Sequence, residues 1–508
     1  MTLPDSADGE PRGHRRTALI ITPDAVYAQV ERLLTAGYRI AMIAGHDDGQ
    51  LLRAVYLFTC ADDDRRVELQ VPVDRADPHL PSVAGLSFPA GRFEREMRDL
   101  FGIVPDGHPL PRRLVRHFHW PQGWYPMRQD AGEAPEFGAV DGPYPFRAVE
   151  GNGVHEIPVG PVHAGLIEPG HFRFSVVGET ILNLKARLWF VHRGIEKQFQ
   201  GLRPDEGLSL AEHISGDTSV GHALAYCQAV EDAASVRVPL AALRIRAVLL
   251  ELERLYNHVT DLGALCNDVG HGVLNSHAGR LRERLLRMND DVTGHRLLRG
   301  GVRVGGAVVR KLPDLAALAA VKDEAGQLHD LALGHSVVRD RFAGTAVLSS
   351  QQAFDLGTLG YVARASGLEV DARWDHPVLS PPQQRLHYEQ TGGDVLARFS
   401  GRAAEVSQSI DMIAHLAEQI DGRVSATSGC VDEPDGLGGS GVGITEGWRG
   451  TIVHRVELKM NGRLSRVKIV DPSFFNWPAL PVALNNTIVP DFPLVNKSFN
   501  LSYAGNDL

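Results

Sequence analysis

Cysteine is scarce in this sequence, and its spacing excludes the common metal-binding motifs. The 508 residues include only four cysteines, at positions 60, 227, 266 and 430, and no two of them form a CxxC pair. Zinc sites and iron–sulfur clusters are commonly held by cysteines in such pairs. We therefore expect reduced thiols, partly buried as small apolar side chains, and no metal or cluster bound directly by this chain.

Long apolar runs and an excess of basic residues are also missing. No stretch approaches the roughly 18–20 apolar residues that a membrane-spanning helix needs. The formal net charge of −10 leaves no basic excess to neutralise phosphates, which argues against nucleic acid as a partner. Residues 1–16 are polar and lack the apolar core of a signal peptide, so we expect a disordered tail there. Association with a membrane must then come through partner subunits.

What remains is a globular composition, with 43% hydrophobic and 22% charged residues, and a length that predicts two or three domains. Strand patterns alternate with one helical pattern in residues 17–130. The strand segments are 18–22, which resembles a buried strand, 39–45, 52–59 and 67–71, and the helical segment is 24–36. Residues 131–150 belong to a Gly- and Pro-rich stretch and are predicted to be a linker.

From about residue 200 onward, amphipathic helices dominate. Three series of apolar residues repeat at intervals of three and four. They are Val248, Leu252, Leu255, Val259 and Leu262; Leu281, Leu285, Met288 and Val292; and Val406, Ile410, Ile413, Leu416 and Ile420. Strand patterns return at 450–470. We predict an α+β protein with a small α/β domain over 17–130 and a larger, mainly helical domain with peripheral β-strands over 151–508.

A first family resemblance lies in residues 93–113. Their sequence, FEREMRDLFGIVPDGHPLPRR, resembles the signature of the 30 kDa subunit of respiratory complex I and of its hydrogenase-fused relatives. The apolar positions at its start share one face of a short helix. The resemblance implies a docking module without a redox centre. A solvated helix face is compatible with that role for the charged residues Glu94, Arg95, Glu96 and Asp99.

A second resemblance begins in the next domain. The string GPVHAGLIEPG at 160–170 and the string HRGIEK at 192–197 resemble the start of the 49 kDa subunit of complex I and of membrane-bound nickel–iron hydrogenase large subunits. A single polypeptide that joins both modules is the arrangement of large subunits of the formate-hydrogenlyase and hydrogenase-4 type. Further motifs follow in the family's order at 252–258, 266–270, 300–302, 446–450 and 472–477.

The cysteines of that family are replaced here. In the hydrogenases, two CxxC pairs supply thiolates, which are soft ligands that suit low-valent nickel and iron. In this sequence Ser215 and Thr218 stand at the first pair of positions, and Ser502 and Gly505 stand at the second. Hydroxyls and a hydrogen cannot hold that cluster. We therefore predict that nickel–iron and intrinsic hydrogenase activity are absent.

The resemblance implies a degenerate pocket at the former metal site. In complex I the equivalent cavity binds a quinone headgroup, and electrons arrive from a [4Fe–4S] cluster in a neighbouring small subunit. A quinone requires hydrogen-bond donors at its carbonyls and a proton source on reduction, so a quinone is a candidate ligand. The expected pocket lining is Ser215, Thr218, His222, Arg449 and Ser502.

Two candidate catalytic residues come from the opening strings of the second domain. His163 matches the first histidine of the complex I loop, whereas Ile167 replaces the second. Glu196 matches the family's proton-relay carboxylate. Its structural alternative is a salt bridge with Arg193 or Lys197.

Other candidates also have structural alternatives. The third catalytic candidate, Asp268, matches an acid that lies toward the membrane subunits in complex I, or caps its helix. His222 is either a pocket residue or a hydrogen-bonded core histidine. Arg449 faces the pocket or pairs with Glu446 or another carboxylate. The glycines of 436–443 form a flexible loop or, as the alternative, a nucleotide site.

The leading functional hypothesis is a subunit of a complex I-like or formate-hydrogenlyase-like oxidoreductase at the cytoplasmic face of the cell membrane. The resemblance implies two kinds of partner: a small iron–sulfur subunit, and membrane subunits of a hydrogenase-4 or complex I-like arm. One alternative is a non-catalytic scaffold subunit of the same complex. The other is an active hydrogen-evolving hydrogenase, which nickel in the purified complex would support.

Overall fold

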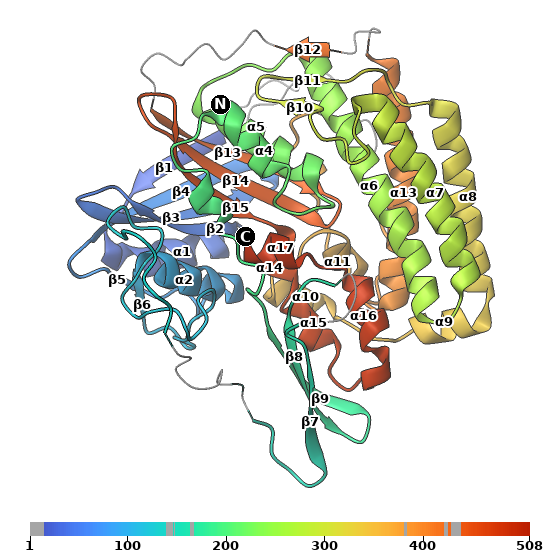
Figure 1. Ribbon diagram of the computed structural model, residues 1–508, viewed down its shortest axis with the longest axis horizontal. Helices are drawn as coiled ribbons and strands as arrows, with labels where there is room; N and C mark the ends of the chain where they lie inside the picture. Colours follow the sequence, from blue (N-terminus) through green and yellow to red (C-terminus); the bar gives the residue numbers. More distant parts are fainter. Residues whose placement is uncertain are drawn as a thin grey trace.

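The predicted α+β class is confirmed by the computed structural model, in which a sheet-containing N-terminal region precedes a larger, mainly helical region (Figure 1). The first strand begins at Arg15, ahead of the expected domain start at residue 17. Cys60, Cys227 and Cys266 are free and buried, as expected. The structure describes residues 15–138, 146, 148–162, 167–379, 384–420, 425–427 and 438–508, so that Cys430 lies outside the described residues.

A four-stranded sheet with the strand order β1-β4-β3-β2 forms the N-terminal region. Strand β1 pairs in parallel with β4, and the other neighbours are antiparallel. The elements are β1 (Arg15–Ile20), α1 (Val26–Thr35), β2 (Arg39–Asp47), β3 (Leu51–Cys60), β4 (Arg65–Asp74), β5 (His79–Pro81), α2 (Phe88–Phe101) and β6 (Val104–Asp106). The run at 18–22 contributes to a strand, but its expected burial was wrong. Ile20 is 78% exposed, because β1 is an edge strand.

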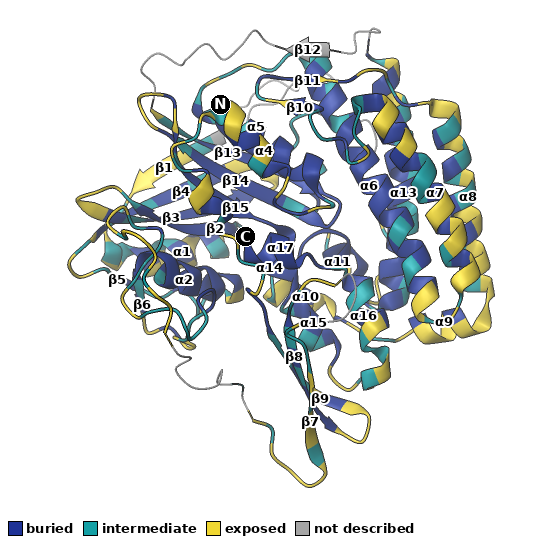
Figure 2. Ribbon diagram, in the orientation of Figure 1, coloured by how far each residue is buried: buried dark blue, intermediate teal, exposed yellow. Residues whose placement is uncertain are grey.

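Helix α2 buries the charged residues that were expected on a solvated face (Figure 2). The expectation of a solvated face was wrong, because all four charged residues are buried: Glu94, Arg95, Glu96 and Asp99. The following loop wraps the helix and supplies polar partners, which buried charges require. One carboxylate oxygen of Asp99 accepts the backbone N–H groups of residues 114–116 at 2.8, 2.8 and 3.2 Å. Arg95 donates to the carbonyls of Arg112 and Arg113.

Two further sheets belong to the second region. The antiparallel strands β7 (Val154–Val159), β8 (His171–Val177) and β9 (Thr180–Arg187) project as an arm at the bottom of Figure 1. The antiparallel strands β13 (Gly439–Gly447), β14 (Gly450–Leu458) and β15 (Leu464–Val470) lie between the N-terminal sheet and the helices. This last sheet therefore connects the two regions.

Strand β13 corrects the expectation of a flexible glycine loop. It packs against α5 (Ser219–Ala233), and a Cβ atom at Gly441 would lie 2.0 Å from the carbonyl oxygen of Ala229. At Gly443 it would lie 1.9 Å from the carbonyl oxygen of Ala225. These glycines therefore allow a helix to approach a strand closely, and no helix begins directly after them. Residues 436–437 lie outside the described residues.

Long helices make up the right side of Figure 1. They are α6 (Leu240–Asp268), α7 (Gly272–Thr293), α8 (Leu315–Gly334) and α13 (Val395–Glu418). The helices predicted from the three apolar series are confirmed, and the members of the series are buried. None of the helices in the described ranges is long and apolar enough to cross a membrane.

Short elements complete the second region. The short helices are α3 (Ile195–Gln198), α4 (Pro204–Ala211), α9 (Ser336–Phe342), α10 (Ser350–Asp355), α11 (Gly360–Ala365), α12 (Ala372–Asp375), α14 (Pro472–Asn476), α15 (Ala479–Ala483), α16 (Phe492–Phe499) and α17 (Tyr503–Asp507). The short strands are β10 (Val302–Arg303), β11 (Gly306–Val308) and β12 (Ser425–Thr427).

Candidate functional site

The positions that carry thiolates in the resembled hydrogenases lie together in this fold. Ser215 follows α4, Ser502 is the N-cap of α17, and their hydroxyl oxygens are 2.8 Å apart. Thr218 is the N-cap of α5, and its backbone N–H donates to the carbonyl of Ser215 at 3.1 Å. The backbone N–H of Gly505 donates to the Ser502 hydroxyl at 2.9 Å. We call these four residues and Asp217, described next, the polar cluster.

Asp217 connects the polar cluster to the surface. The hydroxyls of Ser215 and Thr218 each donate to Asp217 Oδ1 at 3.0 Å. Arg449 forms a bidentate ion pair with both oxygens of Asp217, at 2.6 and 2.7 Å. Burial raises the pKa of Asp217, but the guanidinium outweighs it and the net shift is downward. The side chain of Asp217 remains 38% exposed, so an ionised carboxylate lies at the mouth of the cluster.

His222 is buried on the inner side of the cluster. Its Nε2 lies 3.0 Å from a carboxylate oxygen of Asp471, and its Nδ1 lies 3.0 Å from Nε2 of His454. Asp471 also borders Gly505, where a Cβ atom would lie 2.5 Å from the Asp471 carboxyl carbon. The structure thus places His222 as a hydrogen-bonded core histidine.

These residues do not fit a nickel–iron centre. Ser215 and Ser502 bond to each other and offer hard oxygen atoms, whereas low-valent nickel and iron favour soft thiolates. The carboxylate of Asp471 fills the space that a side chain at Gly505 would need. Among the residues that the structure describes, no group of three or more His, Cys, Asp or Glu side chains is arranged to hold a metal ion. No catalytic step through such a centre can be built here.

Glu196 is buried at the junction of the two regions and is not part of the polar cluster. The expected ion-pair partners Arg193 and Lys197 were wrong, since Glu196 pairs with Arg466 at 2.7 Å and with Lys468 at 3.1 Å. Both partners come from β15, a strand distant in the sequence. Burial raises the pKa of Glu196, but Arg466 and Lys468 outweigh this effect and lower the pKa to about 2. Glu196 is therefore ionised in this arrangement.

Of the other two catalytic candidates, the structure describes only Asp268. Asp268 is the last residue of α6 and is exposed, and in the described ranges no hydrogen bond or ion pair joins it to the polar cluster. The alternative helix-capping role is also unsupported, because no hydrogen bond of its side chain to the described residues is seen. His163 lies outside the described residues.

A buried charge network lies behind the cluster. Glu405 of α13 is 2.8 Å from His258 and 3.4 Å from Arg254, both of α6, and 2.6 Å from Arg364 of α11. Burial raises the pKa of Glu405, but Arg364, His258 and Arg254 hold it well below its usual value. Glu446 belongs to this network through Arg364 at 2.8 Å. Arg449 therefore pairs with Asp217 and not with Glu446.

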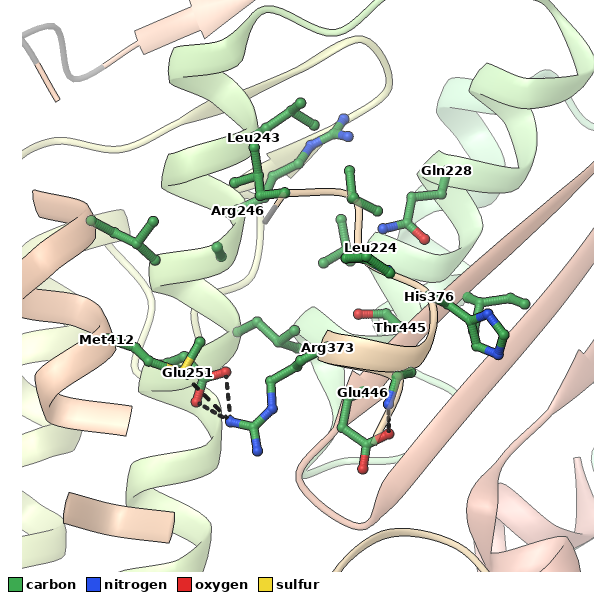
Figure 3. Close-up of a pocket in the computed structure, with 18 residues that line it drawn as sticks. Leu224, Gln228, Leu243, Arg246, Glu251, Arg373, His376, Met412, Thr445 and Glu446 are labelled. Atoms are coloured by element: carbon green, nitrogen blue, oxygen red, sulfur yellow. Dashed lines mark hydrogen bonds and ion pairs between the residues drawn. The ribbon is translucent and has the colours of Figure 1, made fainter. Parts of the chain in front are cut away.

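Figure 3 shows a pocket of about 100 Å³ beside this network. Its walls are mainly apolar side chains of α5, α6, α13 and β13. At its floor, Arg373 points toward Glu251, with the nitrogen and oxygen atoms 3.3 Å apart, and Glu446 accepts the backbone N–H of Ala372. The charges at the floor are thus paired within the chain, and none of the predicted site residues that the structure describes lines the pocket.

Some of the site residues have no local signal in the sequence. Asp217 lies between the two replaced cysteine positions and could have been found from that location, because a carboxylate there must face the same space. His454 lies in β14, and Asp471 follows β15 as the N-cap of α14. Their place beside His222 depends on how the sheet β13–β15 packs against α5.

Comparisons with known proteins agree with both resemblances. The family described as the respiratory-chain NADH dehydrogenase 30 Kd subunit matches residues 19–136, and the 49 Kd subunit family matches residues 268–436. Formate hydrogenlyase subunit 5 of Escherichia coli is 32% identical over 92% of this chain and 84% of that protein. Hydrogenase-4 component G of the same organism is 32% identical over 86% of this chain and 77% of that protein.

A further relative and a solved structure are also similar to this chain. The NADH-quinone oxidoreductase C/D protein of Phocaeicola vulgatus is 29% identical over 68% of this chain and 71% of that protein. A chain in the structure of the membrane-bound sulfane sulfur reductase, an archaeal respiratory membrane complex, matches with a TM-score of 0.62 and 22% identity. That match covers 70% of this chain and 98% of the other, and it shows a shared fold.

Proposed function

The chain belongs to the family that joins a complex I 30 kDa-type domain to a 49 kDa-type domain, and from this premise we propose that it is a subunit of a membrane-associated oxidoreductase complex. The relatives are named as parts of hydrogenlyase, hydrogenase-4 and NADH-quinone oxidoreductase. No described helix can cross a membrane. Membrane subunits of a hydrogenase-4 or complex I-like arm would therefore hold the chain at the cytoplasmic face.

Within that complex, the polar cluster is the proposed place of electron delivery. Electrons would come from a [4Fe–4S] cluster in a neighbouring small subunit and pass to a quinone-like acceptor. The hydroxyls of Ser215 and Thr218 and the guanidinium of Arg449 are the donors that a carbonyl acceptor requires. The observation that carries this proposal is that Asp217, partly exposed, links the surface to these buried groups.

A scaffold role is the second candidate, and a specific observation favours it. Ser215 and Ser502 already bond to each other, and Arg449 is already paired with Asp217. An acceptor would have to displace at least one of these contacts. A subunit that only organises its neighbours would keep the cluster closed.

The intact complex, purified with its membrane subunits, tests both candidates. We expect the complex to contain no stoichiometric nickel. We also expect it to contain iron and sulfide from a partner subunit, together with extractable quinone. Replacing Arg449 by Lys keeps the charge but removes the bidentate fork, and acceptor reduction should fall at least about tenfold, which corresponds to about 1.4 kcal/mol. Unchanged turnover in the assembled variant complex would favour the scaffold. Stoichiometric nickel would contradict both candidates and restore the hydrogenase alternative.

A further inference from the structure

We propose that Glu96 is a proton-exchanging carboxyl group at the junction of the two regions, reached from solvent through a cavity of about 390 Å³. The cavity runs from the exposed side chains of Lys197 and Gln198 to the buried side chains of Glu96 and Glu196. Its other walls come from α2, the loop after α2, residues 192–194 and the last two residues of the chain. Glu96 comes from α2, and Glu196 comes from α3, so the two regions share the buried end.

The two glutamates share one lysine unequally. Lys468 Nζ lies 2.7 Å from Glu96 Oε1 and 3.1 Å from Glu196 Oε1. Glu196 has two further partners, Arg466 at 2.7 Å and the backbone N–H of Ile469 at 2.9 Å. The second oxygen of each glutamate has no hydrogen-bond partner among the described residues, but that of Glu196 still forms the ion pair with Arg466, whereas that of Glu96 forms none of the described ion pairs. Glu96 is therefore the carboxylate whose negative charge is stabilised less.

The surroundings of Glu96 favour its protonated form. Burial raises the pKa of Glu96, Glu196 adds to this shift, and Lys468 and Arg466 only partly oppose it. In contrast, Arg466 and Lys468 hold the pKa of Glu196 at about 2. Arg92 on the same helix faces the junction as well, and the remaining ionisable groups of the cavity are His192, Arg193, Lys197 and Asp507. Glu96 thus gains and loses a proton while Glu196 stays ionised.

No residue of the polar cluster lines this cavity, but Arg193 connects the two. Arg193 lines the cavity and donates to the carbonyls of His213 and Ile214, at 3.1 and 2.6 Å, directly before Ser215. The exchange itself forms and breaks one O–H bond between cavity water and the Glu96 carboxylate. One consequence rests on the proposed function: reduction of a quinone-like acceptor takes up one proton for each electron, and Glu96 would relay these protons from solvent.

Infrared titration of the full-length chain tests Glu96 without any need for turnover. We expect a protonated carboxyl band that persists above the range of ordinary glutamates, near pH 4.3, and that disappears in Glu96→Gln. Glu196→Gln should keep this band. Glu94→Gln is the matched control from the same helix, because burial raises the pKa of Glu94 to about 7, and its loss should remove a different band.

Two variants that keep a carboxyl group address folding. Glu96→Asp should retain a titrating band, and Lys468→Met should move the Glu96 band to higher pH because it removes the shared cation. A spectrum that Glu96→Gln leaves unchanged, or a band that Lys468→Met does not move, would overturn the proposal. In the assembled complex, Glu96→Gln should alter the pH profile of turnover and leave the acceptor KM unchanged. If no variant or wild-type complex reduces an acceptor, the proposed function fails, while the infrared result still decides the role of Glu96.

Discussion

Glu253 is a buried carboxyl group next to the polar cluster, and no cation within the described ranges forms an ion pair with it. Its two oxygens accept the backbone N–H groups of Val220 and Gly221, at 2.6 and 2.9 Å, in the first turn of α5. Burial raises the pKa of Glu253 to about 8, and these hydrogen bonds offset only part of the shift. The folded protein therefore holds a proton on Glu253 that the unfolded chain releases near pH 4.3.

This difference predicts a pH-dependent stability. The pKa of Glu253 is higher in the folded protein than in the unfolded chain. Its contribution to the free energy of unfolding is therefore fully present below about pH 4.3 and is lost as the pH rises toward 8, at up to about 1.4 kcal/mol per pH unit. Glu253→Gln should remove that slope, so the variant gains stability relative to wild type as the pH increases. Urea denaturation midpoints across this pH range measure the effect. Glu31→Gln, on the exposed face of α1, should run parallel to wild type; a parallel Glu253→Gln curve would refute the argument.

At the scale of elements, the periodicity of apolar residues in the sequence predicts the helices that have one buried face. The helices α6, α7 and α13 followed from their apolar series, because such a series reports one buried face. Helix α2 was predicted as a helix, but the burial of its charges was not, since their partners lie outside the helix. Arg95 and Asp99 bond to backbone groups of the following loop, and Glu96 pairs with Lys468 of β15. The glycines of β13 were misread for a similar reason. Their function is contact with α5, and a sequence pattern does not report which element approaches a strand.

The close approach of α5 to β13 leads to a sharp prediction. Gly443→Ala would place a methyl group 1.9 Å from the carbonyl oxygen of Ala225, so the strand or the helix must shift, at a cost of about 3 kcal/mol. Gly279→Ala on α7 is the matched control, because open space surrounds that position. The control should be stabilised by roughly 0.5–1 kcal/mol through its helix propensity. Chemical denaturation of both variants measures the difference, and equal stability would show that the contact is loose.

At the scale of the whole molecule, the N-terminal sheet and the β13–β15 sheet are joined through buried charge. Arg455 of β14 forms a bidentate pair with Glu68 of β4, at 2.9 Å for both contacts, and both side chains are fully buried. Arg66 of β4 also donates to the carbonyl of Val442 in β13. The candidate site could be predicted from the sequence only in part. The family resemblance placed Ser215 and Ser502 in one pocket, whereas the partners of Glu196 depend on how β15 packs against the rest of the fold.

The pair between Arg455 and Glu68 should control whether the two regions unfold together. Arg455→Met leaves the Glu68 carboxylate buried without its main cation, which should destabilise the protein by about 3–5 kcal/mol. Scanning calorimetry should then show the single transition dividing in two, since the N-terminal region is released first. Glu68→Gln combined with Arg455→Met removes both charges and should recover most of the loss, because no unpaired charge remains buried. Arg287→Met, which breaks an exposed pair on α7, should change stability by less than about 0.5 kcal/mol. If the double variant were as unstable as Arg455→Met, the loss of stability would come from packing around the arginine and not from the unpaired Glu68 carboxylate.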